Sequence, residues 1–421
     1  SSSESSDWYK RPIPLFPQSE NIAEISILDY PELSDFLTSG PEWRHQTWSW
    51  GQEFLAFIGR NKSTNTYVRF RSEVEKFLLW SFIKRKQSIV TFKKSEILEY
   101  IEFCNKPDVD WICFTSFEKF VIKAGTFKVN PLWAPFKMSG PVQSSRDKKI
   151  LKGYRPTVGT LNATFTAMIS FYTHLNDEEY YYGNPAKVAK KDCRLLIQDD
   201  TIKDDRRLSD FQWDMLLETS IKMANSDPIF ERNLFLIVSL KTFFIRISEF
   251  AEKKDWIPEM GHFSEDSNGN WWVKVLGKGG KKRSITVPPD YLPYLRRYRI
   301  SRGLSLLPLI GEKEPMIQKI RGRGGLATRH LSKIVTDTFN AVRVELEIQK
   351  KPEEAIKFQA FSAHWLRHTG ASLEVERGRP LKDLSEDLGH STMATTDRTY
   401  VHSDVLKRAK SGAGRKVGKQ N

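Results

Sequence analysis

The sequence lacks the features that mark a membrane or secreted protein. It contains no run of about 18 apolar residues, so no membrane-spanning helix is expected. Residues 1–8 are polar and acidic, without the basic and apolar regions of a signal peptide. The three cysteines, Cys104, Cys113 and Cys193, have neither the spacing of metal ligands nor the even number of a disulfide framework. A reduced cytoplasmic compartment is the simplest expectation, and we assign the cysteines no role.

Positive charge and aromatic side chains, by contrast, are abundant. Lys and Arg outnumber Asp and Glu by 14 among 421 residues. This excess suits a polyanionic partner, nucleic acid first and an anionic membrane second, although a basic soluble protein without such a partner explains it too. The 39% apolar and 12% aromatic residues can supply the cores of two or three domains, which argues against a disordered chain.

Composition divides the chain into five segments. Apolar residues recur at helical spacing in residues 66–80 and again in 157–175, which predicts helices in the first half. A polar stretch with four Asp residues then predicts a linker, and a second mainly helical domain with one strand pair follows. The predicted segments are an N-terminal arm at 1–40, a helical domain at 41–196, the linker at 197–207, the second domain at 208–411 and a basic tail at 412–421.

Two cationic residues stand out in the second domain. Arg246 lies in an otherwise apolar run that we interpret as a helix, and Glu249 is expected to share its face and pair with this buried arginine. An ordinary internal salt bridge would explain that pair. Lys278 has glycine on either side, at the tip of a hairpin predicted from strand patterns at 271–275 and 283–287. A lysine there suits a phosphate or a leaving oxygen, although a solvated basic turn is the simpler explanation, and the spacing of a Walker loop is absent.

The run His364-Trp365-Leu366-Arg367-His368 combines two imidazoles with a guanidinium. His364 and Arg367 are three residues apart and are predicted on one helix face. A guanidinium can clamp two phosphate oxygens, and an imidazole can exchange a proton near neutral pH. Zinc binding by the two histidines is the competing interpretation, but Trp365 replaces the glutamate of the H-E-x-x-H motif. Each histidine taken singly is most simply structural.

A Leu-Gly-His run ends at His390, and Tyr400 follows ten residues later. A phenol has a pKa near 10 and is a poor nucleophile unless cations stabilise its oxyanion. Alone, Tyr400 is most simply a core or surface tyrosine. The order Arg, Lys, His-x-x-Arg, His, Tyr changes that interpretation, because it supplies those cations.

Together these motifs resemble the lambda-integrase family, the tyrosine recombinases of the phage and mobile-element integrase type. The resemblance covers roughly residues 207–406, where R-I-S-E, G-K-G-x-K-x-R, H-x-L-R-H, L-G-H and T-T-x-x-x-Y-x-H occur in family order. Residues 41–196 resemble, more weakly, the family's core-binding domain. The resemblance implies a mainly α fold: an all-α N-terminal domain and an α+β catalytic domain with a small β-hairpin, closing on DNA as a C-shaped clamp.

Two features depart from the family pattern. Phe244 and Ile245 precede the first arginine, where the family usually has a small residue and leucine. The interval from His390 to Tyr400 is ten residues rather than the usual nine, and Thr399 is the apparent insertion. Because each residue turns a helix by about 100°, we expect a loop or bulge to absorb the extra one.

The resemblance also implies the chemistry, that of a site-specific recombinase that cuts and rejoins DNA through a 3′-phosphotyrosyl bond. The reaction would need neither ATP nor a metal nor another cofactor. A homotetramer would carry the exchange through a Holliday junction. The implied roles are phosphate clamps for Arg246 and Arg367, a further donor for His390, a proton acceptor for His364, a proton donor for Lys278, the nucleophile for Tyr400 and an orienting partner of Arg246 for Glu249.

The partners expected are DNA recombination sites, with accessory DNA-bending or directionality proteins. A cytoplasmic, nucleoid-associated location and a bacterial or phage origin follow from the family alone. The segment after Tyr400 would be exchanged between protomers, or be a basic tail. Residues expected to contact DNA are Lys281, Lys282, Arg283, Arg321 and Arg323.

Three alternatives stay open. A catalytically silent DNA-binding protein of this fold is disfavoured because all six chemical positions carry suitable residues. A metal-dependent nuclease would need convergent Asp, Glu or Cys ligands, for which no spacing is seen, and would be inhibited by EDTA. A type IB topoisomerase would relax supercoils without a specific site.

Overall fold

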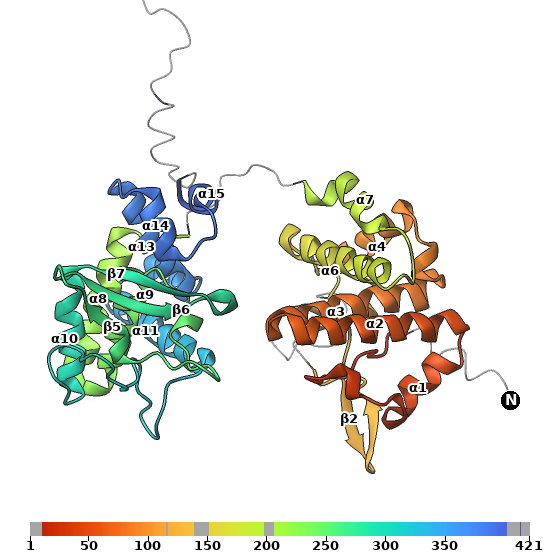
Figure 1. Cartoon of the computed structure of the whole chain (residues 1–421), viewed down its shortest axis with the longest axis horizontal. Coiled ribbons are helices and arrows are strands. Elements are labelled where there is room, and N and C mark those ends of the chain that lie inside the picture. The colour runs from red at the N-terminus through yellow and green to blue at the C-terminus, as the bar shows by residue number, and fades with distance from the viewer. Residues whose placement is uncertain (1–10, 115–116, 139–150, 198–205, 402–412, 414–421) are drawn as a thin grey trace, which may run out of the picture. The chain divides into compact units, whose positions relative to one another are not determined.

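The computed structural model describes residues 11–114, 117–138, 151–197, 206–401 and residue 413 (Figure 1). The chain forms two compact units, Ser1–Thr201 and Ile202–Asn421. Each unit has its own hydrophobic core. The boundary falls within the predicted linker, whose residues 198–205 lie outside the described residues, as does the basic tail apart from residue 413.

The first unit is built mainly of helices, and both helices predicted in it are present. The segment at 66–80 belongs to α3 and that at 157–175 to α6. Each starts after a hydroxyl residue whose side chain accepts a backbone N–H of the first turn, Ser63 for α3 and Thr157 for α6. The helices are α1 (Pro31–Thr38), α2 (Glu42–Asn61), α3 (Thr64–Leu79), α4 (Lys94–Asn105), α6 (Val158–Asp177) and α7 (Pro185–Asp192).

Residues 11–40 are part of this first unit rather than a separate arm. Leu15 and Phe16 are buried in its core, and their amides donate to the Glu75 carboxylate of α3 at 2.8 and 3.1 Å. Lys119 completes the buried cluster with an ion pair to Glu75 at 2.9 Å. An arm was predicted because Pro and Ser residues interrupt any regular spacing of apolar residues in this segment. The apolar stretch that includes Leu15 and Phe16, which anchors it in the core, is too short to produce such a pattern.

The first unit also contains strands, so the expectation of an all-α domain was wrong in this detail. β1 (Ile112–Phe114) pairs in parallel with β4 (Phe136–Met138). β2 (Phe120–Lys123) and β3 (Thr126–Val129) form an antiparallel hairpin. The mainly helical fold class with small sheets is confirmed. All three cysteines are buried thiols that form no disulfide, and burial raises the pKa of Cys104 to about 12.

The second unit packs helices around a three-stranded antiparallel sheet of order β5-β6-β7. The predicted hairpin is confirmed, since Trp271 to Leu276 pair with Val287 to Lys282. None of the helices in the described part of the chain is long and apolar enough to cross a membrane. The elements are α8 (Asp210–Ser226), α9 (Glu231–Thr242), β5 (Phe263–Glu265), β6 (Trp271–Leu276), β7 (Lys282–Val287), α10 (Leu292–Ser301), α11 (Thr328–Ile348), α12 (Pro352–Lys357), α13 (Ala363–Glu376), α14 (Leu381–Leu388) and α15 (Met393–Thr396).

Helices α9 and α13 are in close contact at a glycine. A Cβ added to Gly370 of α13 would lie 2.0 Å from the carbonyl oxygen of Lys241 in α9. No side chain fits at that distance, so the close approach of the two backbones requires glycine. This contact fixes the end of α9, from which the chain leads to Arg246, against the helix that carries Arg367.

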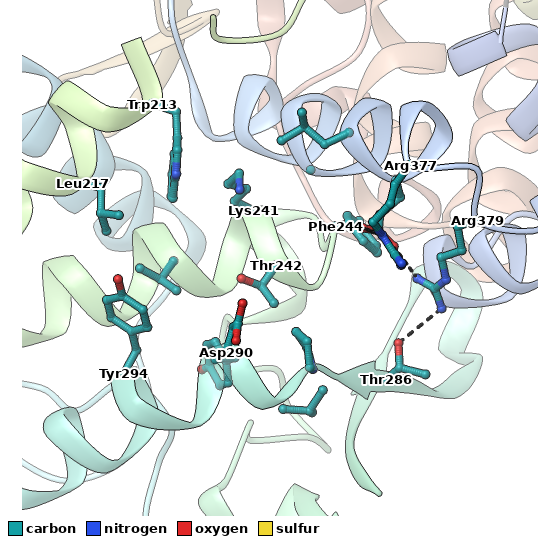
Figure 2. A pocket seen from close by; sticks show the side chains of 17 residues that line it. Trp213, Leu217, Lys241, Thr242, Phe244, Thr286, Asp290, Tyr294, Arg377 and Arg379 are labelled. Carbon is teal, nitrogen blue, oxygen red and sulfur yellow. Dashed lines mark hydrogen bonds and ion pairs between the residues drawn. The ribbon is translucent and has the colours of Figure 1, made fainter. Parts of the chain in front are cut away.

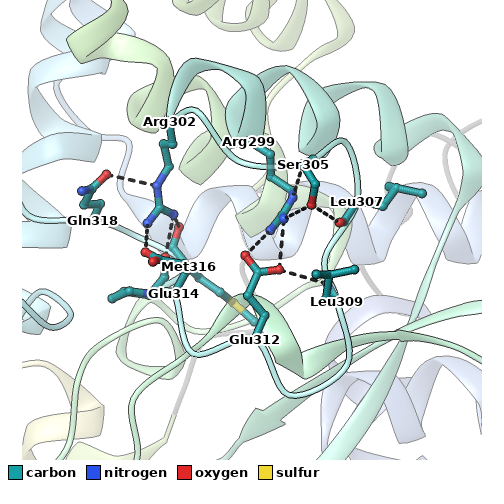
Figure 3. Close-up of polar contacts among 10 residues, drawn as sticks. Arg299, Arg302, Ser305, Leu307, Leu309, Glu312, Glu314, Met316 and Gln318 are labelled. Atoms are coloured by element: carbon teal, nitrogen blue, oxygen red, sulfur yellow. Dashed lines mark hydrogen bonds and ion pairs between the residues drawn. The ribbon is translucent and has the colours of Figure 1, made fainter.

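Two arginines brace the long connection between α10 and α11 (Figure 3). Arg299, only 1% exposed, donates to both carboxylate oxygens of Glu312 at 2.9 and 3.0 Å. Arg302 donates to the carbonyl oxygen of Pro315 at 2.6 Å. Two-point contacts of this kind hold an irregular segment in one conformation. The basic loop at 321–325, predicted from its glycines, follows this braced stretch.

Candidate active site

Arg367 is a buried arginine among the residues predicted to be catalytic. It lies on α13 with 2% of its surface exposed. Its guanidinium donates to the carbonyl oxygen of Phe244, after α9, and to that of Leu388, at the end of α14, the latter at 3.0 Å. Burial is the main reason that its pKa is lowered. Arg367 therefore joins three segments of the chain through backbone carbonyls.

The structure places Arg246 differently from the prediction. Helix α9 ends at Thr242, and Arg246 is in extended backbone before the short 3-10 turn Ile247–Glu249. Its side chain is 40% exposed, so the prediction of a buried arginine inside a helix was wrong. Phe244 has a φ of 53°, a left-handed conformation that strains a bulky residue. The carbonyl of this strained residue is the one that Arg367 holds.

Glu249 contacts Arg246 as predicted, but its main partner is another arginine. Its carboxylate accepts the Arg246 backbone N–H at 2.8 Å, whereas the Arg246 guanidinium is 3.8 Å away. Arg283 donates twice to the same carboxylate, at 2.7 and 3.1 Å. The side chain of Arg283 is only 13% exposed. It is therefore engaged within the unit, contrary to the expectation that it contacts DNA.

His390 contacts Arg367 and Thr396, the second threonine of the T-T-x-x-x-Y-x-H motif, to which no role was assigned from the sequence. Its Nε2 is 3.4 Å from an Arg367 nitrogen, and its Nδ1 is 2.8 Å from the Thr396 hydroxyl. Because arginine can only donate, Nε2 must be the acceptor, so the proton is on Nδ1 and points to Thr396. Burial, with the charges of Arg367 and other arginines, lowers the pKa of His390 to about 4.

His364 and His368 form a hydrogen-bonded pair one turn apart on α13. Their Nε2 atoms are 2.8 Å apart, so one ring donates and the other accepts. The His368 ring packs on Tyr400 with centroids 5.2 Å apart. Burial and the neighbouring His364 lower the pKa of His368 to about 4. The i, i+4 spacing of His364 and His368 in H-x-L-R-H could have predicted that the two rings lie together and that His368 belongs to the site.

Tyr400 lies in a small apolar cluster with 3% of its surface exposed. Burial raises its pKa, while the charge and hydrogen bonding of Arg367 and the charge of Arg246 act in the opposite direction. The residues Asp397–Val401 form a π-helical turn directly after α15. This turn is the bulge expected for the extra residue. It leaves the ring of Tyr400 6.3 Å from that of His390 and nearly parallel to it.

The remaining predicted residues are on the surface. Lys278 is exposed in the turn Lys278–Gly280 between β6 and β7, where Gly279 and Gly280 both have positive φ. Thus the turn needs its glycines. The other side chains predicted to contact DNA are also exposed, and that role stays a prediction; they are Lys281, Lys282, Arg321 and Arg323.

A pocket of about 740 Å³ adjoins this site (Figure 2). Residues of α8, α9, β7 and α13 line it, and the six residues predicted to be catalytic do not. Phe244 lines it and also provides the carbonyl that Arg367 holds. The pocket is thus separate from the catalytic cluster but shares the strained segment with it.

Residues 206–407 match the phage integrase family. The tyrosine recombinase XerC of Bacillus licheniformis is 28% identical over 253 residues, covering 59% of this chain and 72% of that protein. The XerC of Pelobacter propionicus is 26% identical over 272 residues, 62% of this chain and 76% of that protein. The crystal structure of XerH site-specific recombinase bound to a palindromic difH substrate, a post-cleavage complex, has a TM-score of 0.53 at 16% identity and covers 85% of this chain and 81% of that one.

The second unit therefore carries a phage integrase family domain. The chain is similar to the tyrosine recombinases.

Proposed function

We propose that this protein cuts and rejoins DNA at specific sites by forming a 3′-phosphotyrosyl bond with Tyr400. The observation that carries the proposal is that Arg367, His390 and His368 all surround one tyrosine, whose pKa responds to Arg367 and Arg246. The Arg246 segment, helix α13 and the stretch from His390 to Tyr400, which are distant in sequence, meet there. The XerC relatives and the DNA-bound XerH structure support DNA as the partner.

In the proposed reaction the Tyr400 oxygen attacks the scissile phosphorus and the bond to the 5′-oxygen breaks. Negative charge grows on the nonbridging oxygens, so fixed donors aimed at them supply most of the stabilisation. Arg367 and Arg246 are assigned as these donors. Arg367 is held by two backbone carbonyls, whereas Arg246, with 40% of its side chain exposed, can reach an incoming phosphate.

Two proton transfers accompany the exchange. The phenol of Tyr400 gives its proton to the His364–His368 pair, because the two rings share a hydrogen bond and His368 packs on the tyrosine. Lys278 donates a proton to the departing 5′-oxygen, with the exposed glycine turn bringing its ammonium to DNA. In rejoining, a 5′-hydroxyl attacks the phosphotyrosyl bond and both protons return.

The contact between His390 and Thr396 allows His390 to become a phosphate donor. In the structure Nε2 accepts from Arg367 and Nδ1 donates to Thr396. A hydroxyl can donate as well as accept. When a phosphate replaces Nε2 as the acceptor of the Arg367 N–H, Thr396 can donate to Nδ1. Proton exchange with solvent, Nδ1 losing a proton and Nε2 gaining one, then leaves the neutral ring with an Nε2–H that can donate to the phosphate.

The assembly that we propose follows the family. The two units close on a duplex as a clamp, four protomers hold two duplexes, and the exchange passes through a Holliday junction. The first unit acts as the core-binding domain, and exposed basic residues of the second unit contact phosphates. The segment proposed to be exchanged between protomers begins after Tyr400, mostly outside the described residues.

The test is a suicide substrate, nicked near the cleavage site and taken from DNA flanking the gene, incubated in EDTA. We expect an SDS-resistant protein–DNA adduct with the wild type and none with Tyr400→Phe. Tyr294→Phe, which removes a phenol elsewhere in the same unit, is the matched control and should react like the wild type. An adduct in Tyr400→Phe would mean another nucleophile.

Other results point to the alternatives. Cleavage that EDTA abolishes would indicate a metal-dependent nuclease. Relaxation of supercoiled DNA without any specific site would indicate a type IB topoisomerase. Tight binding of a fragment without an adduct would indicate a silent DNA-binding protein.

A further inference from the structure

Arg283 of β7 connects its own hairpin to two other segments that carry predicted catalytic residues. Its Nη atoms donate to Glu249, next to the Arg246 segment, and its Nε donates to the carbonyl oxygen of Asp387 at 2.9 Å, three residues before His390. β7 itself follows the turn that carries Lys278. One guanidinium therefore links the hairpin, the Arg246 segment and the L-G-H segment.

Two glycines of the sequence motifs make room for this guanidinium. A Cβ on Gly277, at the start of the G-K-G turn, would lie 2.8 Å from an Arg283 nitrogen. A Cβ on Gly389, in L-G-H, would lie 3.0 Å from the Arg283 guanidinium carbon, and this glycine also has a φ of 71°. Both glycines thus leave space for the same side chain.

The contacts of Glu249 show what Arg283 can do for Arg246. Glu249 is buried, and a buried carboxylate requires a cation close to it. Arg283 supplies that cation through two hydrogen bonds to the Glu249 carboxylate, and the Arg246 guanidinium lies 3.8 Å from the same carboxylate. Without Arg283, the nearest cation able to neutralise Glu249 is Arg246, which would then be withdrawn from the phosphate.

We propose that Arg283 is a positioning residue that keeps Arg246 available to the scissile phosphate by occupying the Glu249 carboxylate. The inference rests on the proposed function and deepens it. It predicts that the loss of Arg283 is harmful chiefly because Glu249 keeps its charge. A purely structural role predicts no such dependence.

The test compares adduct formation in single and double variants. Arg283→Met should slow it about 100-fold, the effect of losing one oriented donor. Arg283→Met/Glu249→Gln should recover to within about 10-fold of the wild type, because the neutral amide no longer captures Arg246 but can still accept its backbone N–H. Thermal unfolding of each variant verifies that it is folded.

Arg379→Met is the matched control. Arg379 is as buried as Arg283, with 14% of its side chain exposed, and also ties β7 to α14. It donates to Thr286 at 3.2 Å (Figure 2) and to Asp387 at 2.7 Å. It does not bond Glu249. We expect a rate within about 3-fold of the wild type. Equal losses in Arg379→Met and Arg283→Met, or no recovery in the double variant, would overturn the proposal.

A binding cycle separates this inference from the proposed chemistry. In the Tyr400→Phe background, where no bond forms, Arg246→Ala should weaken binding to duplex DNA in otherwise wild-type protein. It should have little further effect once Arg283→Met is present, because Arg246 is already withdrawn. Equal effects in both backgrounds would refute the positioning role even if no adduct is ever detected.

Discussion

The two sides of the candidate site are built in opposite ways. On the α13 side, Arg367 and Tyr400 are buried and His390 is held between an arginine and a threonine. On the hairpin side, Arg246 is 40% exposed and Lys278 lies on an open glycine turn. Groups on the first side are fixed by the protein interior, whereas those on the second are available to a ligand that arrives from outside. Mutations should therefore couple activity to stability on one side only.

The largest contrast is expected between the two arginines. Arg367→Ala and Arg246→Ala should each slow adduct formation by about 1000-fold, because each removes a donor to the phosphate. Arg367→Ala should also lower the free energy of unfolding by about 3 kcal/mol, since two buried carbonyls lose their partner. Arg246→Ala should change it by less than about 0.5 kcal/mol. Denaturant unfolding measures both; equal destabilisation would erase the distinction.

Lys278 provides a sharper test of the hairpin side. Lys278→Met should slow cleavage by about 100-fold, as for loss of a general acid, without a change in melting temperature. A substrate with sulfur in place of the departing 5′-oxygen should cleave equally fast with both proteins, because a thiolate leaves without a proton. If the variant stays slow on that substrate, Lys278 does not protonate the leaving group.

Thr396 should have a smaller effect on the α13 side. Thr396→Val keeps the shape of the side chain but removes the hydroxyl that His390 needs in either tautomer, and we expect about a 10-fold slower cleavage. Thr396→Ser should retain most of the rate. Single-turnover adduct formation distinguishes the two, and a fully active valine variant would contradict the proposed tautomer change.

The smallest effect expected is one of pH on stability. The pKa values of His368 and His390 are about 4, below the ordinary 6.5, so the unfolded chain takes up protons first as the pH falls. Their contribution is complete above about pH 6.5 and is lost as the pH falls toward 4. The melting temperature should therefore drop between pH 7 and pH 5, and less so in His368→Asn. A drop of the same size in this variant would exclude His368 as a source.

Much of this site could be predicted because most of its residues lie within short sequence motifs. The hairpin and the shared helix face of His364 and Arg367 follow from strand patterns, glycines and helical spacing, whereas the choice of Tyr400 rests on the resemblance to the tyrosine recombinases. Arg246 was predicted inside a helix because apolar residues continue beyond Thr242, where α9 ends. The close backbone contact at Gly370 and the positive φ of Phe244 accompany this helix end, and neither could be predicted from the sequence. Arg283 resembled a DNA contact because its buried partner, Glu249, is 34 residues away. Pairings of that kind require the fold.

The π-helical turn at Asp397–Val401 has a consequence for how such chains are found and altered. A search pattern that fixes the interval between the last histidine and the tyrosine would reject this sequence, although its two rings are still close and parallel. The π-helical turn accommodates the additional residue, so the phenol of Tyr400 is not rotated away from His390. The interval can therefore be one residue longer without separating the two rings, and the ring-to-ring geometry is the quantity to compare among relatives.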